Sequence, residues 1–528
     1  MAVELLRFLR TSPRFAVLCA AIATLTLASV AWSLHRKPKP WAAGQVPIAF
    51  WAWRNEAPSD ADVRRAMQRT RARTLFLRAG QIDFRDGRLQ RIRSVAGTLP
   101  QGIELHLVYN ATRALLAQLE NVDEKLLAAS LAETLAQDLE RGRRDQATVA
   151  GLQIDIDVPT RLLPRYAKTL RALHARLQPG IQLSITGLPT WMDSVALSGV
   201  LDQVDFWIPQ CYGSEIPERL DQSIPISSPQ LVARAVTRAR EFNRPFYAGL
   251  AAYSYALLYS SSGSLITLRG DMNLSRVAND ANLELIDRRV FDNSSEWRYV
   301  YRARGGGVIE GLAMNAGDVL VIDSPGTLSL QQAARAVREN AGEKLLGICV
   351  FRLPGESDTA TLSIEQIAAA LGDVQARADV SAAIVARPAN DPHGPGVLSE
   401  AQLTVVNSGT KGILAGDGLT IDLTIPPGSA SQTSLNGFSS VTTQCVAAPP
   451  DSLEAVDSFE ASMPCSERRA NVLRFKAATL APGESAAATF VFGGPLPSVL
   501  FAHIEIQAND GQTQVLHQQL VVNGGVGK

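Results

Sequence analysis

Cysteine and histidine are scarce in this chain of 528 residues, and it carries no net charge. Its five cysteines and six histidines form no CxxC or Cys/His spacing of the kind that holds zinc. Its 51 basic residues are balanced by 51 acidic residues, so no net field attracts a polyanion. The sequence therefore indicates no metal, no cofactor and no nucleic-acid partner, and it is silent on protein partners.

Charge is also missing from a long run near the N-terminus, residues 15–34, which follows three arginines and a single acid. At about 1.5 Å per residue this run is long enough to cross a hydrocarbon core of roughly 30 Å. Residues 1–40 are therefore predicted to be an export signal that stays in the inner membrane as an anchor and places the rest of the chain in the periplasm. Ser29 and Ala31 also fit a small-x-small cleavage site, and cleavage would instead release a secreted protein.

Of the cysteines beyond this run, Cys445 and Cys465 are separated by 20 positions. In an oxidising periplasm a disulfide between them would stabilise the fold by about 3 kcal/mol. Two free thiols are the alternative.

Residues 46–374 alternate short apolar runs with helical patterns, as parallel strands joined by crossover helices require. A helix is clearest where Leu127, Leu131 and Leu135 follow one another at helical spacing. Residues 254–344 interrupt the order and predict an extra lobe on the seventh connection. The fold class is therefore α/β, a (β/α)8 TIM barrel, with predicted strands at residues 48–53, 74–78, 103–109, 152–157, 182–187, 204–212, 246–251 and 345–352.

Helical periodicity stops near residue 375, and residues 376–528 alternate turns with short β-prone runs. The turns Asn407-Ser-Gly409 and Leu480-Ala-Pro-Gly-Glu484 are typical of immunoglobulin-like domains of bacterial surface proteins. We predict an all-β immunoglobulin-like sandwich that acts as a spacer or a wall against the barrel, with a glycan-binding module as the alternative. Its predicted strands are residues 403–406, 419–425, 472–475, 488–492, 502–507 and 515–522.

The polar residues of the fourth barrel strand are the first candidates for chemistry. Residues 151–159 alternate with a period of two, so Gln153, Asp155 and Asp157 share one face. The apolar face meets the helices, so this polar face points into the barrel, with Asp157 nearest the C-terminal mouth. Two confined carboxylates about 7 Å apart do not both ionise freely, and one pKa should rise towards the range of a general acid. We interpret both as catalytic candidates; a buried polar network that closes the barrel is the alternative.

Several motifs resemble known families. The fourth strand, residues 183–189 and residues 204–212 resemble, in order and spacing, strands four to six of family 18 chitinases. The chain is more similar still to the bacterial domain of unknown function 3142, over most of the barrel and none of the sandwich. The resemblance implies a chitinase-like barrel that takes a polysaccharide or oligosaccharide. The residues that carry it are 50–53 (Phe-Trp-Ala-Trp), 153–157 (Gln-Ile-Asp-Ile-Asp), 186–191, and 351–354 (Phe-Arg-Leu-Pro) with Asp358.

Two departures from the chitinase pattern bear on catalysis. Chitinases of family 18 carry D-x-x-D-x-D-x-E on strand four, and aligning its last two aspartates with Asp155 and Asp157 puts Pro159 at the catalytic glutamate. The M-x-Y-D of strand six is replaced by Gln210-Cys-Tyr-Gly213, which keeps the tyrosine and loses the acid. The resemblance therefore does not imply a standard substrate-assisted chitinase.

Other residues complete the predicted site. Glu215 follows the sixth strand and is predicted to face Asp157 as a second catalytic carboxylate, as glycoside hydrolysis requires. Arginines at strand ends bind substrate or, alternatively, pair with an interior aspartate. Aromatic residues there stack on sugar rings or, alternatively, plug the core. The predicted substrate-binding residues are Trp53, Arg78, Tyr109, Gln153, Thr186, Trp191, Gln210, Tyr212 and Arg352.

These patterns predict a carbohydrate-active, glycoside hydrolase-like envelope protein that acts on or binds a polysaccharide in the barrel mouth. A barrel without catalysis, which binds glycans or serves as a scaffold of an envelope assembly, is the alternative that Pro159 and Gly213 favour. A purely structural anchor would pair both aspartates with Arg78 or Arg352.

Overall fold

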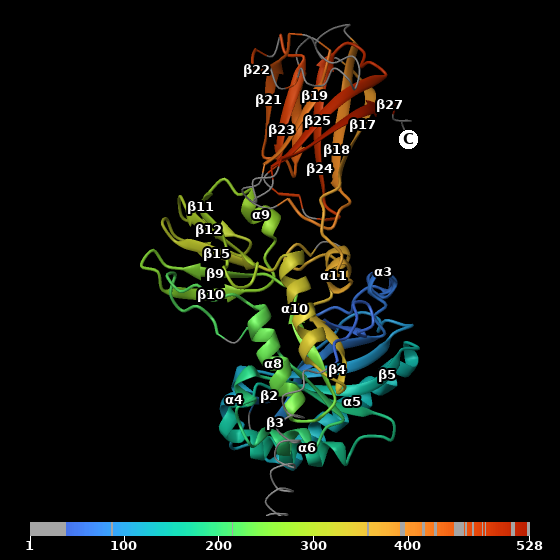
Figure 1. Cartoon of the computed structure of the whole chain (residues 1–528), viewed down its shortest axis with the longest axis vertical. Coiled ribbons are helices and arrows are strands. Elements are labelled where there is room, and N and C mark those ends of the chain that lie inside the picture. The colour runs from blue at the N-terminus through green and yellow to red at the C-terminus, as the bar shows by residue number, and fades with distance from the viewer. Residues whose placement is uncertain are drawn as a thin grey trace, which may run out of the picture.

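The computed structural model describes residues 39–528 except 86–87, 214, 356–357, 391–396, 414–417, 427–429, 448–458, 460–461, 467–468, 478, 481, 508–512 and 525–528. A barrel lies at one end and a β-sandwich at the other, with an insertion lobe beside the barrel on the side that faces the sandwich (Figure 1). The predicted export segment, residues 15–34, lies outside the described residues. Within the described ranges, no helix has the length and apolar character needed to span a bilayer.

The barrel is a closed parallel sheet. β1 pairs with β16 on one side and with β2 on the other, which closes the ring in the order β1-β16-β8-β7-β6-β5-β4-β2. Each of the eight predicted runs forms one of its strands, so the (β/α)8 prediction is confirmed. The strands are β1 (Ile48–Ala52), β2 (Thr74–Arg85), β4 (Glu104–Ala111), β5 (Thr148–Asp155), β6 (Gln182–Gly187), β7 (Phe206–Pro209), β8 (Phe246–Ala251) and β16 (Leu345–Phe351).

One strand of this sheet escaped prediction. β2 continues past the barrel wall to Arg85 and turns back as the antiparallel β3 (Arg88–Ser94). The sequence of β3 is mostly polar and its side chains are mostly exposed, so it has no apolar periodicity to reveal a strand.

Helices cover the outside of the ring (Figure 1). In the longest, α5, the Asp123 carboxylate caps the start by accepting from the Leu126 backbone N–H, and arginines occupy the last turn. Its buried stripe includes the predicted Leu127, Leu131 and Leu135. The covering elements are α3 (Asp60–Thr70), α4 (Arg113–Gln118), α5 (Glu124–Arg144), η1 (Thr160–Leu162), α6 (Leu163–His174), η2 (Pro189–Trp191), α7 (Leu197–Leu201), α8 (Pro229–Glu241), α10 (Thr327–Asn340) and α11 (Ile364–Leu371).

The interior of the barrel is packed rather than open. Trp51, Phe76, Phe206 and Cys349 form a separate buried cluster inside the ring, and the Trp51 and Phe76 rings lie 6.2 Å apart. Such a layer of large side chains is typical of TIM barrels, and it leaves only the C-terminal mouth above it for a ligand.

The predicted insertion is an antiparallel lobe between β8 and α10. Its five-stranded sheet has the order β10-β9-β15-β12-β11, with a separate hairpin of β13 and β14. Its elements are β9 (Tyr255–Tyr259), β10 (Leu265–Arg269), α9 (Leu274–Ala278), β11 (Leu283–Val290), β12 (Trp297–Ala303), β13 (Gly307–Ile309), β14 (Leu312–Met314) and β15 (Val319–Ser324).

The C-terminal part is all β, and each of its six predicted runs forms a strand. One sheet has the order β20-β24-β18-β17-β27 and the other β22-β21-β23-β19-β25-β26. Leu403, Ile421, Phe475 and Phe490 pack together in the core between them. The strands are β17 (Val380–Asn390), β18 (Val397–Asn407), β19 (Gly418–Thr424), β20 (Ala430–Asn436), β21 (Ser440–Cys445), β22 (Met463–Pro464), β23 (Val472–Ala477), β24 (Ser485–Gly493), β25 (Val499–Gln507), β26 (Thr513–Val521) and β27 (Asn523–Gly524).

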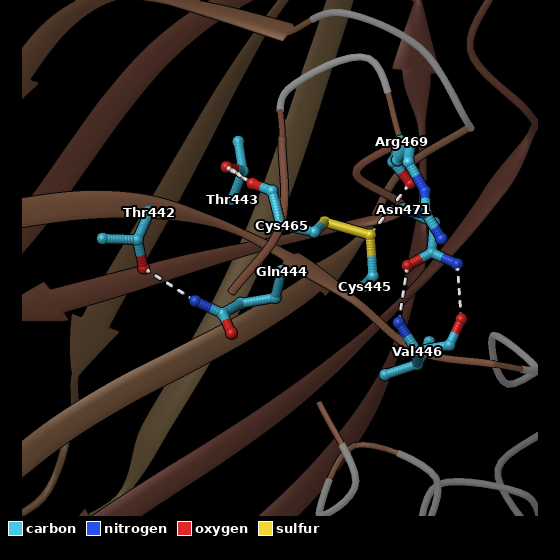
Figure 2. The surroundings of a disulfide bond; sticks show 8 residues. All are labelled: Thr442, Thr443, Gln444, Cys445, Val446, Cys465, Arg469 and Asn471. Atoms are coloured by element: carbon cyan, nitrogen blue, oxygen red, sulfur yellow. Dashed lines mark hydrogen bonds between the residues drawn. A yellow bond between two sulfur atoms is a disulfide. The ribbon is translucent and has the colours of Figure 1, made fainter. Parts of the chain in front are cut away.

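A disulfide joins Cys445 to Cys465 across the end of β21, with their Cα atoms 5.8 Å apart, which confirms the predicted pair (Figure 2). Beside it the Asn471 side chain holds the main chain of Val446 from both sides, accepting at 2.9 Å and donating at 2.8 Å. Cys211 and Cys349 are buried free thiols in the barrel. The disulfide therefore ties down the β21 edge of the sandwich, which lies at the other end of the molecule from the barrel (Figure 1).

Candidate active site

Polar side chains follow neighbouring strands around the C-terminal mouth of the barrel. Arg78, Asn110, Asp155 and Thr186 come from β2, β4, β5 and β6 in that order, and Gln210 follows β7. Their strand neighbours are buried against the outer helices, so alternation turns these five side chains inward. Because all parallel strands end at the same rim, the five residues form one polar arc.

Asp155 is the central group of this arc. It is the last residue of β5, and the Thr186 hydroxyl donates a hydrogen bond of 2.6 Å to its Oδ1. Burial, helped by the negative charge of Asp157, raises the pKa of Asp155 to about 7, although the Thr186 hydrogen bond and the Arg78 charge oppose the rise. Asp155 is therefore able to hold and release a proton near neutral pH.

Asp157 does not line the barrel wall as expected. β5 ends at Asp155, and the Val158 backbone N–H donates to the Ile156 carbonyl at 2.7 Å, which makes a tight turn around Asp157. The side chain of Asp157 is exposed at the rim, yet the protein around it still desolvates the carboxylate enough to raise its pKa. Asp157 thus faces the solvent side of the mouth above Asp155.

Gln153 is a structural residue and not a ligand contact. Its side chain is fully buried, accepts a hydrogen bond of 2.7 Å from Trp51 Nε1, and lies 3.5 Å from the Ser184 hydroxyl. A buried amide must find partners within the protein, and the barrel floor supplies them. The prediction that Gln153 binds substrate is wrong for this reason.

Aromatic rings form one side of the mouth. Phe351, at the end of β16, lies 5.7 Å from the Trp53 ring, 6.1 Å from Tyr212 and 5.2 Å from Tyr253. Trp53 and Tyr253 are half-buried and therefore reach the surface of the mouth, whereas Tyr212 is nearly covered. The sequence predicted Trp53 and Tyr212 here but missed Phe351 and Tyr253, although Phe351 lies one residue before the end of the predicted strand 345–352.

Two predicted aromatic contacts are wrong. Tyr109 shares the outward face of β4 with the apolar residues, and its hydroxyl donates to Asp138 of α5 at 2.5 Å. Trp191 is 1% exposed, packs on Tyr166 at 6.0 Å, and donates from Nε1 to the Val158 carbonyl at 2.8 Å. Both belong to the layer between strands and helices, and Trp191 supports the turn that carries Asp157.

The two predicted arginines have different positions. The Arg78 guanidinium donates to Asn110 at 3.2 Å and lies 5.4 Å from the centre of the Trp53 ring, so it belongs to the mouth. Arg352 is buried, pairs with Asp358 at 3.1 Å and donates to the Gly270 carbonyl at 2.9 Å. These bonds engage the buried Arg352 guanidinium with groups of the protein, which contradicts its assignment to substrate, and neither arginine forms an ion pair with Asp155.

Glu215 lies in the segment after β7 with its side chain exposed. In the described part of the chain, the charges that shift the pKa of Asp155 are those of Asp157 and Arg78, and Glu215 does not contribute. The expected placement of Glu215 opposite the aspartates therefore has no electrostatic support. Among the described residues, no three His, Cys, Asp or Glu side chains are close enough to share a metal ion.

The strand order and the polar arc define the class of the protein: a (β/α)8 barrel with a carboxylate pair and aromatic rings at its C-terminal mouth. Residues 111–291 match the family described as domain of unknown function 3142, which confirms the predicted resemblance over that range. The matched range begins at the end of β4 and includes both aspartates, Thr186 of β6 and Gln210 after β7. No curated protein matches the chain.

Solved structures of several bacterial proteins have a similar course of the chain, among them the following three. The Bacillus cereus spore cortex-lytic enzyme SleL is 14% identical with a TM-score of 0.41, and the match covers 62% of this chain and 74% of that one. A chitinase from Chromobacterium violaceum is 12% identical with a TM-score of 0.43, over 62% and 99%. A family 18 N-acetylglucosaminidase from Paenibacillus barengoltzii is 12% identical with a TM-score of 0.40, over 62% and 99%. Likeness of this degree assigns no activity.

Proposed function

We propose that this chain is a glycoside hydrolase-like protein that binds a polysaccharide or oligosaccharide in the barrel mouth and cleaves it there. One observation carries the proposal: the half-buried Asp155 carboxyl, with its pKa raised to about 7, lies at a rim that combines polar and aromatic side chains. A general acid is most effective when its pKa is near the working pH.

The two aspartates take different roles in the proposed reaction. Asp155 holds a proton near neutral pH and gives it to the oxygen of the leaving sugar as the glycosidic bond breaks. Asp157 at the rim, in its ionised form, stabilises the positive charge that develops on the sugar ring, and a water molecule then adds to the ring and returns a proton to Asp155. Arg78 and Thr186 position Asp155, and Trp53 and Tyr253 offer ring faces to the sugar.

A glycan-binding barrel without catalysis is the second candidate. Pro159 stands where the chitinase pattern has its catalytic glutamate, and Gly213 stands where that pattern has an acid. In this proposal the same rim holds a saccharide as part of an envelope assembly, and no bond is cleaved.

Turnover and binding of glycans by the full chain, with Asp155→Asn in parallel, separate the two candidates. Product that forms with the parent and not with the variant supports the hydrolase. Binding by both proteins without product on any bacterial or plant glycan tested would exclude the hydrolase for those glycans and support the binding barrel.

We also propose that the protein works in the periplasm, anchored by residues 1–40, or secreted if that segment is cleaved. The disulfide supports an oxidising compartment. We further propose that the sandwich is immunoglobulin-like. Its neighbours β17-β18-β24-β20 and β19-β25-β26 have the order of the A-B-E-D and C-F-G strands of such domains.

A further inference from the structure

A cavity of about 520 Å³ lies outside the barrel mouth. The lobe lines it through Trp297 and Tyr299, the barrel through Arg65, Thr359 and Glu365, and the sandwich through Ser485. Its volume lies within the roughly 300–1,000 Å³ typical of small-ligand pockets. We propose that this cavity is a second binding site, which takes a neutral oligosaccharide.

Hydrogen bonds hold the walls of the cavity in place. The Leu274 backbone N–H of the lobe donates to the Thr359 hydroxyl at 3.0 Å, and the Thr327 hydroxyl of α10 donates to the Thr410 carbonyl of the sandwich at 3.0 Å. Asn407 ties together the two sandwich loops that face the barrel, because its Nδ2 donates to the carbonyls of Lys411 and Leu480 at 2.9 and 3.0 Å. The two turn motifs of the sandwich therefore build one wall.

Both loops require glycine at a turning point, Gly409 for lack of space and Gly483 for its backbone conformation. A Cβ on Gly409 would meet the Arg377 carbonyl at 2.3 Å, and Gly483 has a φ of +83°. The Gly483 backbone N–H donates to the Asn407 carbonyl at 2.7 Å. The wall is thus a built feature of the sandwich sequence and not a chance contact between loops.

The aromatic wall suits the C–H face of a sugar ring. Trp297 and Tyr299 are two apart on β12 and share one face of the strand, with their rings 6.3 Å apart and inclined by 23°. The two rings together form a flat apolar strip at the cavity. Pockets that bind small ligands combine such strips with a few fixed polar groups.

Polar groups in the cavity require a ligand with hydroxyls. Within the described chain, Glu365 Oε2 and Thr479 Oγ1 are buried without a hydrogen-bond partner, and both residues line the cavity. An apolar ligand would leave these atoms unpaired at a cost of about 1–3 kcal/mol each. Hydroxyl groups donate to and accept from such atoms.

Charge at the cavity disfavours an anion, because four carboxylates and one guanidinium, that of Arg65, line it. Two of the four carboxylates already have counter-ions, because Glu365 pairs with Arg65 at 2.9 Å and Asp358 pairs with Arg54 at 2.8 Å. A neutral polyhydroxylated molecule fits this lining.

The cavity shares a wall with the barrel mouth. Tyr253 belongs to the aromatic side of the mouth, whereas its neighbour Ser254 and its strand partner Thr361 line the cavity. A saccharide held in the cavity therefore lies beside the rim on which the mouth would bind its own ligand. The second site does not depend on catalysis at the mouth.

Calorimetric binding of tetrasaccharides to the full chain tests the proposal. The probes are the tetramers of N-acetylglucosamine, glucose in β-1,4 linkage and xylose. The cavity variants are Trp297→Ala and Ser485→Trp, which adds bulk at an exposed position of the cavity rim. Trp297→Phe keeps a ring, and Trp53→Ala is the matched control at the mouth.

We expect at least one probe whose binding weakens at least tenfold in both cavity variants and is preserved in Trp297→Phe and Trp53→Ala. Hydrogen exchange around Thr359 and Ser485 should slow when that probe binds the parent. Binding that only Trp53→Ala removes would overturn the second site while leaving the mouth proposal intact. Absence of binding by every probe, with all variants folded by circular dichroism, would overturn it as well.

Discussion

Asp155 in the barrel mouth and Asp323 in the insertion lobe are both carboxylates withdrawn from water, but their partners differ. Asp323 accepts two hydrogen bonds of 2.7 Å from Arg298, whose guanidinium also donates to the Gln222 carbonyl at 2.7 Å. Asp155 accepts from the neutral hydroxyl of Thr186 and lies near the like charge of Asp157. A carboxylate that forms an ion pair with a buried arginine, as Asp323 does, stabilises the fold. A carboxylate at a strand end without such a partner, as Asp155 is, can exchange a proton near neutral pH.

Breaking the buried pair of the lobe should have the largest effect. Arg298→Ala leaves Asp323 buried without its counter-ion, so we expect the free energy of unfolding to fall by about 3–5 kcal/mol. Urea denaturation measures the loss. The double variant Arg298→Met with Asp323→Leu removes both charges and should recover most of the stability. If the free energy of unfolding of Arg298→Ala fell by less than about 1 kcal/mol, the Arg298–Asp323 pair would not be a structural one, and Asp323 would no longer differ from Asp155 in this respect.

Asp155→Asn should lower turnover and leave stability unchanged, which is the opposite of the effect expected for Arg298→Ala. We expect turnover of a cleaved glycan to fall by at least about 100-fold, because a proton donor contributes that much or more. Stability at pH 8 should not fall, since the amide replaces a carboxyl whose ionisation burial disfavours. Turnover and urea midpoints are measured on the same preparations. Asp157→Asn is the control: a larger effect there than at Asp155 would reverse the proposed roles.

The barrel followed from the sequence because its strands have a strong physical signature. β6 and β8 begin and end at the predicted residues, since each alternates or runs apolar between clear turn signals. Tyr109 was misplaced although it shares the parity of Leu105 and Leu107, which face the helices. Its position near a strand end favours a ligand contact, but the face of the strand on which it lies points to the helices.

Other features of the mouth depend on contacts that are distant in sequence. Nothing in residues 151–159 shows that the strand ends at Asp155 and turns at Asp157, because the alternating pattern continues through both. Arg352 is held by Asp358 and by Gly270 of the lobe, and the second of these partners is 82 positions away. Hydrophobic periodicity and secondary-structure propensity carry no information about contacts between residues so far apart in sequence. The structural role of Arg352 was therefore not predictable.

Glu296 extends the contrast to a carboxyl that holds a loop. It is buried in the lobe and accepts 2.8 Å hydrogen bonds from the backbone N–H groups of Ile226 and Ser227, in the connection that follows Tyr212. Burial raises the pKa of Glu296 to about 8 in spite of these bonds. The folded protein therefore binds its proton more tightly than the unfolded chain, and this stability is present below about pH 4.5 and is lost as the pH rises towards 8.

Glu296→Gln should flatten that pH dependence. The amide cannot ionise, so urea midpoints between pH 5 and pH 9 should fall less in the variant than in the parent. Glu215→Gln changes an exposed carboxyl in the segment that follows β7, and it is the matched control. This variant should have the same dependence of the urea midpoint on pH as the parent. A variant profile as steep as that of the parent would mean that Glu296 does not titrate in this range.

The smallest effect is expected at Thr186, which tunes Asp155 without reacting. Its hydroxyl lowers the pKa of Asp155, so Thr186→Val should raise that pKa further, by about one unit or less, as the loss of one hydrogen bond implies. Because the protonated form of Asp155 donates in the proposed reaction, the alkaline limb of the pH profile of kcat/KM should move to higher pH. Thr186→Ser keeps the hydroxyl and should keep the limb in place. A change in rate without movement of the limb would mean that the titration seen in the profile does not belong to Asp155, and the mouth would then resemble the lobe in holding its carboxylate for structure.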